Sequence, residues 1–307
     1  SNVLLSNKVN YWTGQEGKKF ESEFANWCNT KYSVALANGT VALEIALKAL
    51  GIGPGDEVIV TPRSFIASVS CVISVGARPV FADVDSNSGN INADSIKGLI
   101  TQKTKAIICV HLAGFPCEMD EIMSLSIKNN IYVIEDCAQS HGAKYKGMPV
   151  GSIGHIGCWS FCQDKIMTTG GEGGMITTND ENLWRKAWSM KDHGKSIQSV
   201  YETKYSSGYR WLHDSFGSNL RMTEMQATIG RIQLKRVGEW KDQRSENANT
   251  IIDVFKKYDS LIRIPKVKNI FDHAWYKLNV YVKIKGLAKN WNRDRIIEEI
   301  NELNIPC

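Results

Sequence analysis

The chain contains 307 residues, of which 43% are hydrophobic and 22% are charged, and its formal net charge at pH 7 is +5. These values are typical of a globular protein, and the length suits one large domain with part of a second. No apolar run reaches the ~18 residues of a membrane-spanning helix, and residues 1–8 lack the apolar core of a signal peptide, so we expect a cytoplasmic protein without membrane contacts. The scattered basic residues favour a small anionic partner over nucleic acid.

Short β-rich runs alternate with longer helical patterns through the first 180 residues. This alternation predicts βαβ units and an α/β fold with a mostly parallel sheet. Several of the runs are apolar on both faces, as expected for strands covered by helices on both sides. The expected strands span residues 33–37, 57–61, 79–82, 106–111 and 131–135, and the expected helices span 41–50, 66–75, 94–100 and 119–128.

The pattern changes after Gly174. A polar, aperiodic stretch over residues 191–218 predicts a long functional loop. We expect a large domain over residues 1–235 and a smaller α+β domain over 236–307, which looks incomplete because the chain ends just after a helix, where another strand would be expected. The remaining expected elements are strands over 175–178 and 278–284 and helices over 181–190, 223–237, 240–258 and 292–303.

The cysteines form no CxxC pair, and several lie within apolar runs. Buried free thiols in a reducing cytosol are therefore expected. We expect no metal site, because the ligand spacings of structural zinc sites are missing. The eight cysteines are Cys28, Cys71, Cys109, Cys117, Cys137, Cys158, Cys162 and Cys307.

The stretch from Trp159 to Gly174 is the most informative part of the chain. Lys165 lies there between a strand-like apolar segment and a glycine-rich turn, whose glycines allow the backbone to approach a bound group closely. Partial desolvation at such a position favours the neutral amine, which is a nucleophile toward carbonyl groups. Schiff-base chemistry with pyridoxal phosphate (PLP) is the expected use, and the alternative is a surface lysine beside a turn.

Two turns that follow predicted strands offer partners for such a cofactor. The N–H groups of Gly39 and Thr40, with the Thr40 hydroxyl, form a possible phosphate site at a helix N-terminus; the alternative is a simple N-cap by Asn38 or Thr40. Asp136 ends a predicted buried strand, where open α/β sheets bind ligands. Its carboxylate could keep the pyridinium nitrogen of PLP protonated, or it could merely cap a neighbouring turn.

Two further side chains complete the candidate set. Phe65 follows the strand predicted at residues 57–61 and could stack on a flat ring, although a core phenylalanine is the alternative. The Ser160 hydroxyl, five residues before Lys165, could reach the same phosphate as Thr40.

Together these motifs resemble the DegT/StrS family of PLP-dependent sugar aminotransferases, which have fold type I. The resemblance begins at about Tyr11 and covers almost the whole chain, and the order and spacing of the motifs make it specific. The motifs are Asn38-Gly39-Thr40, Thr61 with Phe65-Ile66-Ala67-Ser68, Glu135-Asp136-Cys137-Ala138-Gln139, Ser160-Phe161 with Lys165, Gly171-Glu172-Gly173-Gly174-Met175, and Gly217-Ser218-Asn219-Leu220-Arg221-Met222-Thr223-Glu224-Met225-Gln226-Ala227.

The resemblance implies a role for each matching position. Lys165 would form the Schiff base and then move the proton, and Asp136 would pair with the ring nitrogen. Gln139 would contact the hydroxyl region of the ring, and Phe65 would stack on it.

The phosphate of PLP would have ligands from two subunits. Gly39, Thr40 and Ser160 would hold it within one subunit, whereas Asn219 would reach the phosphate in the neighbouring subunit. This implies a homodimer with two shared active sites.

The implied reaction moves an amino group from L-glutamate to a keto group of a nucleotide-linked deoxysugar, for a bacterial surface polysaccharide. Lys191, His193 and Lys195 are candidates for contacting the substrate diphosphate, with a solvated loop as the alternative. A sugar dehydratase of the same family would carry histidine in place of Lys165, and a non-catalytic regulator would have lost Lys165 or Asp136. A Rossmann protein would carry GxGxxG after the first strand, which is absent here.

Overall fold

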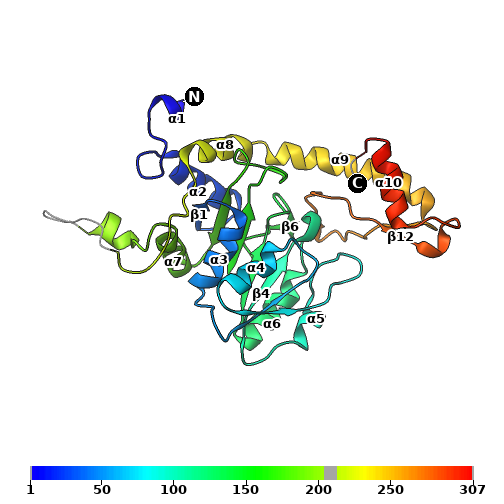
Figure 1. Ribbon diagram of the computed structural model, residues 1–307, viewed down its shortest axis with the longest axis horizontal. Helices are drawn as coiled ribbons and strands as arrows, with labels where there is room; N and C mark the ends of the chain where they lie inside the picture. The colour runs from blue at the N-terminus through cyan, green and yellow to red at the C-terminus, as the bar shows by residue number, and fades with distance from the viewer. Residues whose placement is uncertain (1, 204–212, 306–307) are drawn as a thin grey trace.

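The computed structural model describes residues 2–203 and 213–305. Its centre is a twisted sheet with helices around it (Figure 1). The sheet has seven strands in the order β1-β9-β8-β5-β4-β2-β3. Neighbouring strands from β8 to β3 are parallel, whereas β9 is antiparallel to both β8 and β1, so the predicted mostly parallel sheet is confirmed. The strands are β1 (Tyr32–Leu36), β2 (Glu57–Val60), β3 (Arg78–Phe81), β4 (Thr104–Val110), β5 (Tyr132–Asp136), β8 (Ile156–Ser160) and β9 (Gly174–Thr178).

Helices cover both faces of this sheet. On one face α3 (Gly39–Ala49), α4 (Ala67–Ser74) and α7 (Glu181–Lys191) share a core with inward side chains such as Val34, Ile134 and Ile176. On the other face α2 (Glu16–Trp27) and α8 (Glu224–Leu234) pack beside β1, β8 and β9, while α5 (Ala93–Lys97) and α6 (Met119–Asn129) pack beside β2, β4 and β5. Alternate residues of each strand enter the two cores, as the two-residue period of a strand requires.

The C-terminal part of the chain leaves the sheet along α9 (Val237–Phe255), and β12 (Tyr281–Val282) and α10 (Arg293–Glu302) lie toward the far end of this helix (Figure 1). β10 (Ile262–Arg263) pairs with β12. One segment returns to the sheet domain, where β11 (Phe271–Asp272) pairs with β6 (Lys144–Tyr145), the partner of β7 (Met148–Pro149). The short remaining elements are α1 (Asn2–Leu5), η1 (Leu112–Gly114), η2 (Gln198–Glu202), η3 (Lys256–Tyr258) and η4 (Ile284–Gly286).

The structure changes several expected boundaries. The helix expected at residues 94–100 is α5, which ends at Lys97, and the strand expected at 278–284 shrinks to β12. Tyr132 lies in a strand expected to be covered on both faces, yet it is 41% exposed because it begins β5 at the rim of the sheet. The loop expected over residues 191–218 begins one residue later, because Lys191 still belongs to α7, and the loop contains η2. Residues 204–212 of this loop lie outside the described residues, as does Cys307.

None of the helices in the described ranges has the length and apolar composition needed to cross a bilayer. The cysteines of the described part are free thiols, and all of them except Cys162 are buried. Burial raises the pKa of the Cys71 thiol to about 12, so this thiol stays protonated at neutral pH.

Candidate active site

A cavity of about 600 Å³ opens at the carboxyl ends of β1, β2, β5 and β8. The predicted site residues come from four separate turns, and the parallel strand directions bring these turns to one edge of the sheet, where α/β sheets bind ligands. Asn219 is the predicted site residue that does not line this cavity. Those that line it are Gly39, Thr40, Phe65, Asp136, Gln139, Ser160 and Lys165.

The N-terminus of α3 forms one wall of the cavity. The Asn38 side chain accepts a hydrogen bond from Val41 N at 2.9 Å and caps the helix, so the capping alternative is correct for Asn38. The helix itself offers no carbonyl to the N–H groups of Gly39 and Thr40, which leaves them available to an anion. A Cβ atom on Gly39 would lie 2.6 Å from Cβ of Ser160, so glycine allows the close approach of these two walls. This cradle fits a phosphate group.

Asp136 lies on the floor of the cavity and is 5% exposed. Its carboxylate accepts hydrogen bonds from Ser68 Oγ at 2.7 Å and from Ala138 N at 3.1 Å. Burial raises the pKa of Asp136, and these hydrogen bonds offset only part of that effect. No cation among the described residues forms an ion pair with this buried carboxylate, so its place in the cavity suits a positively charged ring nitrogen. Ser68 was not predicted as a site residue, although it belongs to the motif that contains Phe65.

Glu135, the preceding residue, faces the opposite side of the sheet. It accepts hydrogen bonds from His111 Nε2 at 3.0 Å, from Gly151 N and Ile153 N at 2.8 Å each, and from Gly154 N at 2.6 Å. Burial alone would raise the pKa of Glu135, but the hydrogen bonds outweigh it, and the pKa is lowered. The two adjacent acids therefore have opposite environments, and the role of Glu135 is structural.

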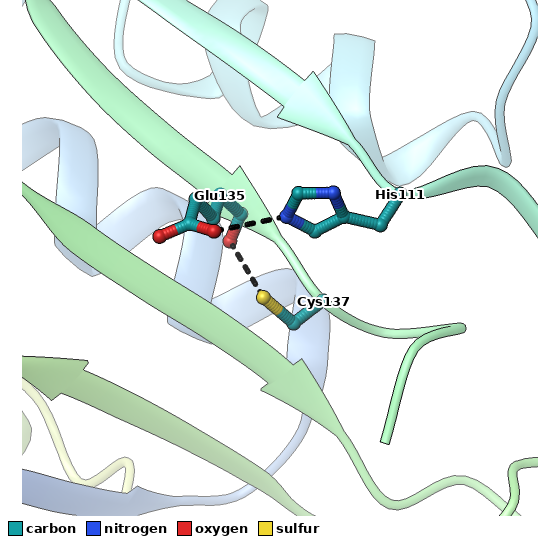
Figure 2. Close-up of side chains that lie close together, drawn as sticks. All are labelled: His111, Glu135 and Cys137. Atoms are coloured by element: carbon teal, nitrogen blue, oxygen red, sulfur yellow. Dashed lines mark hydrogen bonds and ion pairs between the residues drawn. The ribbon is translucent and has the colours of Figure 1, made fainter. Parts of the chain in front are cut away.

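His111, Glu135 and Cys137 lie close enough together to suggest a metal site (Figure 2). However, His111 Nδ1 accepts from Cys117 N at 3.0 Å, so Nε2 carries the proton that it donates to Glu135. Burial also raises the pKa of the Cys137 thiol well above its ordinary value, and Sγ contacts the Glu135 carbonyl oxygen at 3.7 Å. Because both ring nitrogens are engaged and the thiol is protonated, the cluster is a hydrogen-bonded core rather than a set of free ligands.

The Lys165 side chain reaches the cavity and is 15% exposed. Its Nζ lies 3.4 Å from Asp164 Oδ1 and 5.2 Å from the ring centre of Tyr276. Tyr276 OH donates to the other Asp164 oxygen at 2.7 Å, and this bond lowers the pKa of Asp164 more than any other interaction. Asp164 and Tyr276 were not predicted. The sequence carries no sign that the segment after β11 returns to Lys165.

Gln139 and Phe65 hold the remaining predicted positions. The side-chain oxygen of Gln139 accepts from Ala113 N at 2.7 Å, which fixes the amide beside the cavity. Phe65 is 67% exposed at the cavity edge, so its interpretation as a core residue is wrong. An exposed ring at this place can stack on a flat ligand.

The three basic candidates after α7 are not equivalent. Lys191 is fully buried, with its Nζ 3.6 Å from the ring centre of Tyr11 and 3.5 Å from Glu21 Oε1. Both earlier interpretations of Lys191, as a substrate ligand and as a solvated residue, are therefore wrong. Lys195 lies 3.8 Å from Asp192 and over the Trp12 ring, whereas His193 is exposed. None of the three lines the cavity.

Comparison with known proteins agrees with this geometry. Residues 2–307 match the model of the DegT/DnrJ/EryC1/StrS aminotransferase family. The chain is 39% identical over 298 residues to GDP-perosamine synthase of Escherichia coli O157:H7, covering 96% of this chain and 76% of that protein.

Solved structures show the same relationship. An aminotransferase from Psychrobacter cryohalolentis is 62% identical with a TM-score of 0.98, covering 100% of this chain and 79% of that one. NtdA of Bacillus subtilis, with bound cofactor PMP, is 28% identical with a TM-score of 0.83, covering 98% of this chain and 64% of that one. The predicted fold type I is thereby confirmed, and the chain belongs to the DegT/DnrJ/EryC1/StrS family of PLP-dependent aminotransferases.

Proposed function

We propose that the protein moves an amino group from L-glutamate to a keto group of a nucleotide-linked deoxysugar, in the cytoplasm, for a bacterial surface polysaccharide. The observation that carries the proposal is the presence of Lys165 and Asp136 in one cavity beside the α3 N-terminus. Similarity to GDP-perosamine synthase supports a nucleotide-sugar substrate.

PLP, when bound, supplies an electron sink for the carbanion formed at the substrate carbon. Lys165 Nζ is the nucleophile that holds the cofactor, and the same atom then takes up and returns the substrate proton. Asp136, oriented by Ser68 and Ala138, keeps the ring nitrogen protonated. The Phe65 ring would cover the cofactor, and Gln139 would contact its hydroxyl region.

The N–H groups of Gly39 and Thr40 and the hydroxyl groups of Thr40 and Ser160 would hold the phosphate. The three residues line the same cavity, and the close contact between Gly39 and Ser160 places a helix N-terminus beside a hydroxyl group. Both are ligands that suit a phosphate dianion.

We propose that the active protein is a homodimer and that Asn219 completes the phosphate site of the other subunit. Asn219 is exposed and does not line its own cavity. Phe216 nearby is 100% exposed, and Ile66 beside the cavity is 65% exposed, as expected for apolar groups that a second subunit covers. We further propose residues 1–235 and 236–307 as the two domains.

A sugar dehydratase is the competing function. Because the resemblance assigns histidine to the position of Lys165 in those enzymes, the lysine and its contact with Asp164 favour transamination. A non-catalytic role is disfavoured because Lys165 and Asp136 are both placed in the cavity.

An absorbance titration tests the proposal. The PLP-loaded protein should lose its visible band on addition of L-glutamate and regain it when a nucleotide 4-keto sugar is added from a panel. Lys165→Ala protein loaded in the same way is the control and should show no cycle. Dehydration of the sugar without transfer of nitrogen would overturn the proposal.

A further inference from the structure

Asn219 belongs to a short extended segment that is held from two sides. On the side of α7, Asp192 and Asn219 form an antiparallel bridge. Two hydrogen bonds flank this bridge, from Leu220 N to Lys191 O at 3.0 Å and from His193 N to the Ser218 carbonyl at 3.1 Å. The backbone of Asn219 is therefore fixed against the end of α7.

The other side of the segment contacts β1, which is an edge strand of the sheet. Ala37 N donates to Leu220 O at 2.9 Å, and Leu36 forms an antiparallel bridge with Arg221. The chain continues from Ala37 directly into the Asn38-Gly39-Thr40 turn of the cavity. The segment that carries Asn219 thus extends the sheet next to the phosphate turn of its own subunit.

A buried ion pair lies across this segment. Arg221 Nη1 is 2.6 Å from Asp192 Oδ1, and the two side chains are 13% and 0% exposed. Asp192 Oδ2 and Arg221 Nε are also buried and have no hydrogen-bond partner among the described residues. The pair is joined by a single hydrogen bond, and Lys195 Nζ adds a further positive charge 3.8 Å from Asp192 Oδ1. Removal of the Asp192 charge therefore leaves Arg221 poorly compensated, whereas removal of the Arg221 charge leaves Asp192 with the more distant Lys195 alone.

The register places this pair beside Asn219. In an antiparallel bridge the two opposed residues lie on one face, and the residue two positions further along the strand lies on the same face. Asp192 is opposite Asn219, and Arg221 is two positions after it.

We propose that Asp192 and Arg221 are positioning residues, whose ion pair fixes Asn219 for contact with the cofactor phosphate of the partner subunit. The inference rests on the shared-site homodimer proposed above. It adds that Asp192, a fully buried residue of one subunit, controls cofactor binding in the other.

Hybrid dimers test this inference, with PLP as the probe. Differently tagged subunits are co-expressed, and hybrids of Asp192→Asn with Lys165→Ala are isolated by two affinity steps. Because the Lys165→Ala subunit cannot hold PLP covalently, borohydride fixes PLP to the Asp192→Asn subunit alone. Mass spectrometry of that subunit over a range of PLP concentrations gives the affinity of its site, which needs no turnover.

The Asp192→Asn homodimer should bind PLP roughly ten- to a hundred-fold more weakly than wild type. This is the effect of losing one charge-assisted hydrogen bond, here the proposed bond from Asn219 to the phosphate. In the hybrid, the Asp192→Asn subunit should recover wild-type affinity, because its site receives Asn219 from a subunit with an intact ion pair. Arg221→Lys keeps the charge but not the donor position of Nη1, so this second variant should show a smaller weakening and the same recovery. Glu57→Gln removes the charge of a buried acid that pairs with the exposed Arg78 near the opposite edge of the sheet, and this variant should bind PLP like wild type.

Three results would overturn the inference. Wild-type affinity in the Asp192→Asn and Arg221→Lys homodimers would show that the pair does not act on the site. Weak binding that persists in their hybrids, while a parallel Asn219→Ala hybrid recovers, would show that the pair acts within its own subunit. If the Asn219→Ala hybrid also fails to recover, the shared-site homodimer itself is wrong.

Discussion

Glu135 and Asp136 are adjacent acids with opposite environments, and replacing each by its amide should have opposite consequences. Asp136→Asn should abolish most of the activity and spare the fold, whereas Glu135→Gln should damage the fold.

The magnitudes follow from the hydrogen-bond partners. Each Glu135 oxygen accepts from two donors, with His111 and Gly151 on Oε2 and Ile153 and Gly154 on Oε1. A glutamine NH₂ group would face two N–H donors in either orientation. We therefore expect a loss of roughly 2–6 kcal/mol in the free energy of unfolding, at about 1–3 kcal/mol for each buried donor left without an acceptor.

Asp136 has a simpler environment. An asparagine can accept from Ala138 N through its oxygen and donate to Ser68 Oγ, whose proton then turns toward Ser64 Oγ at 2.6 Å. The fold should therefore tolerate Asp136→Asn. Turnover should fall by roughly 10²–10³, because a preorganised charge at the reacting centre is lost.

The pH dependence gives the sign of each effect. The pKa of Glu135 is lowered from its ordinary value of 4.5, so Glu135 contributes stability that is present above pH 4.5 and is lost as the pH falls through the lowered pKa. The pKa of Asp136 is raised from 3.8, so the native state retains a proton that the unfolded state has released. Asp136 therefore destabilises the cofactor-free protein as the pH rises from 3.8 through the raised pKa. At pH 7 the cofactor-free Asp136→Asn protein should be more stable than wild type. Below pH 3.8 this advantage should be absent.

Urea unfolding of cofactor-free protein, followed by tryptophan fluorescence at fixed protein concentration, measures both stabilities between pH 3.5 and 7.5. A steady-state transamination assay measures turnover. Turnover of Asp136→Asn within tenfold of wild type, or wild-type stability of Glu135→Gln at pH 7, would refute the assignment of one acid to chemistry and the other to the fold.

Three further predictions concern the cavity. Lys165→Ala should give no borohydride-fixed PLP adduct, and an adduct at another lysine, located by peptide mapping, would remove Lys165 from its role. Gly39→Ala should weaken PLP binding at least tenfold, because the added Cβ would lie 2.6 Å from Cβ of Ser160. The control is Gly238→Ala in α9, where nothing lies within 4 Å of the added Cβ. This control should leave PLP affinity unchanged and stabilise the protein by about 0.4–1 kcal/mol. Iodoacetamide should label Cys162, which lines the cavity, and bound PLP should protect this thiol. The buried thiol of Cys71 is the control and should stay unlabelled until urea unfolds the protein. If PLP leaves the labelling of Cys162 unchanged, the cofactor binds elsewhere.

The sequence predicts the cavity well because its residues occupy turns directly after strands. Once a parallel sheet is inferred, Asp136 and Ser160 must reach the same edge, whatever the details of packing. Lys191 shows the limit of this reasoning. It occupies a polar stretch, yet its ammonium group lies over the Tyr11 ring, and no local pattern relates two residues that are 180 positions apart. Tyr276 beside Asp164 is unpredictable for the same reason.

The opposite roles of Glu135 and Asp136 make the register of β5 a functional property. Residues 133, 135 and 137 of this part of the chain face α6 and α2, whereas Ile134 and Asp136 face α3 and α4. A slip of one residue would exchange the faces, so that Glu135 would enter the cavity and Asp136 would face the donors of residues 151–154. The pairs Val110↔Asp136 and Asp136↔Cys158 on the two sides of β5 prevent this slip. The hydrogen bonds of Glu135 to a loop and to His111 add a second constraint on the same register, so the structural acid positions the neighbour for which we propose the catalytic role.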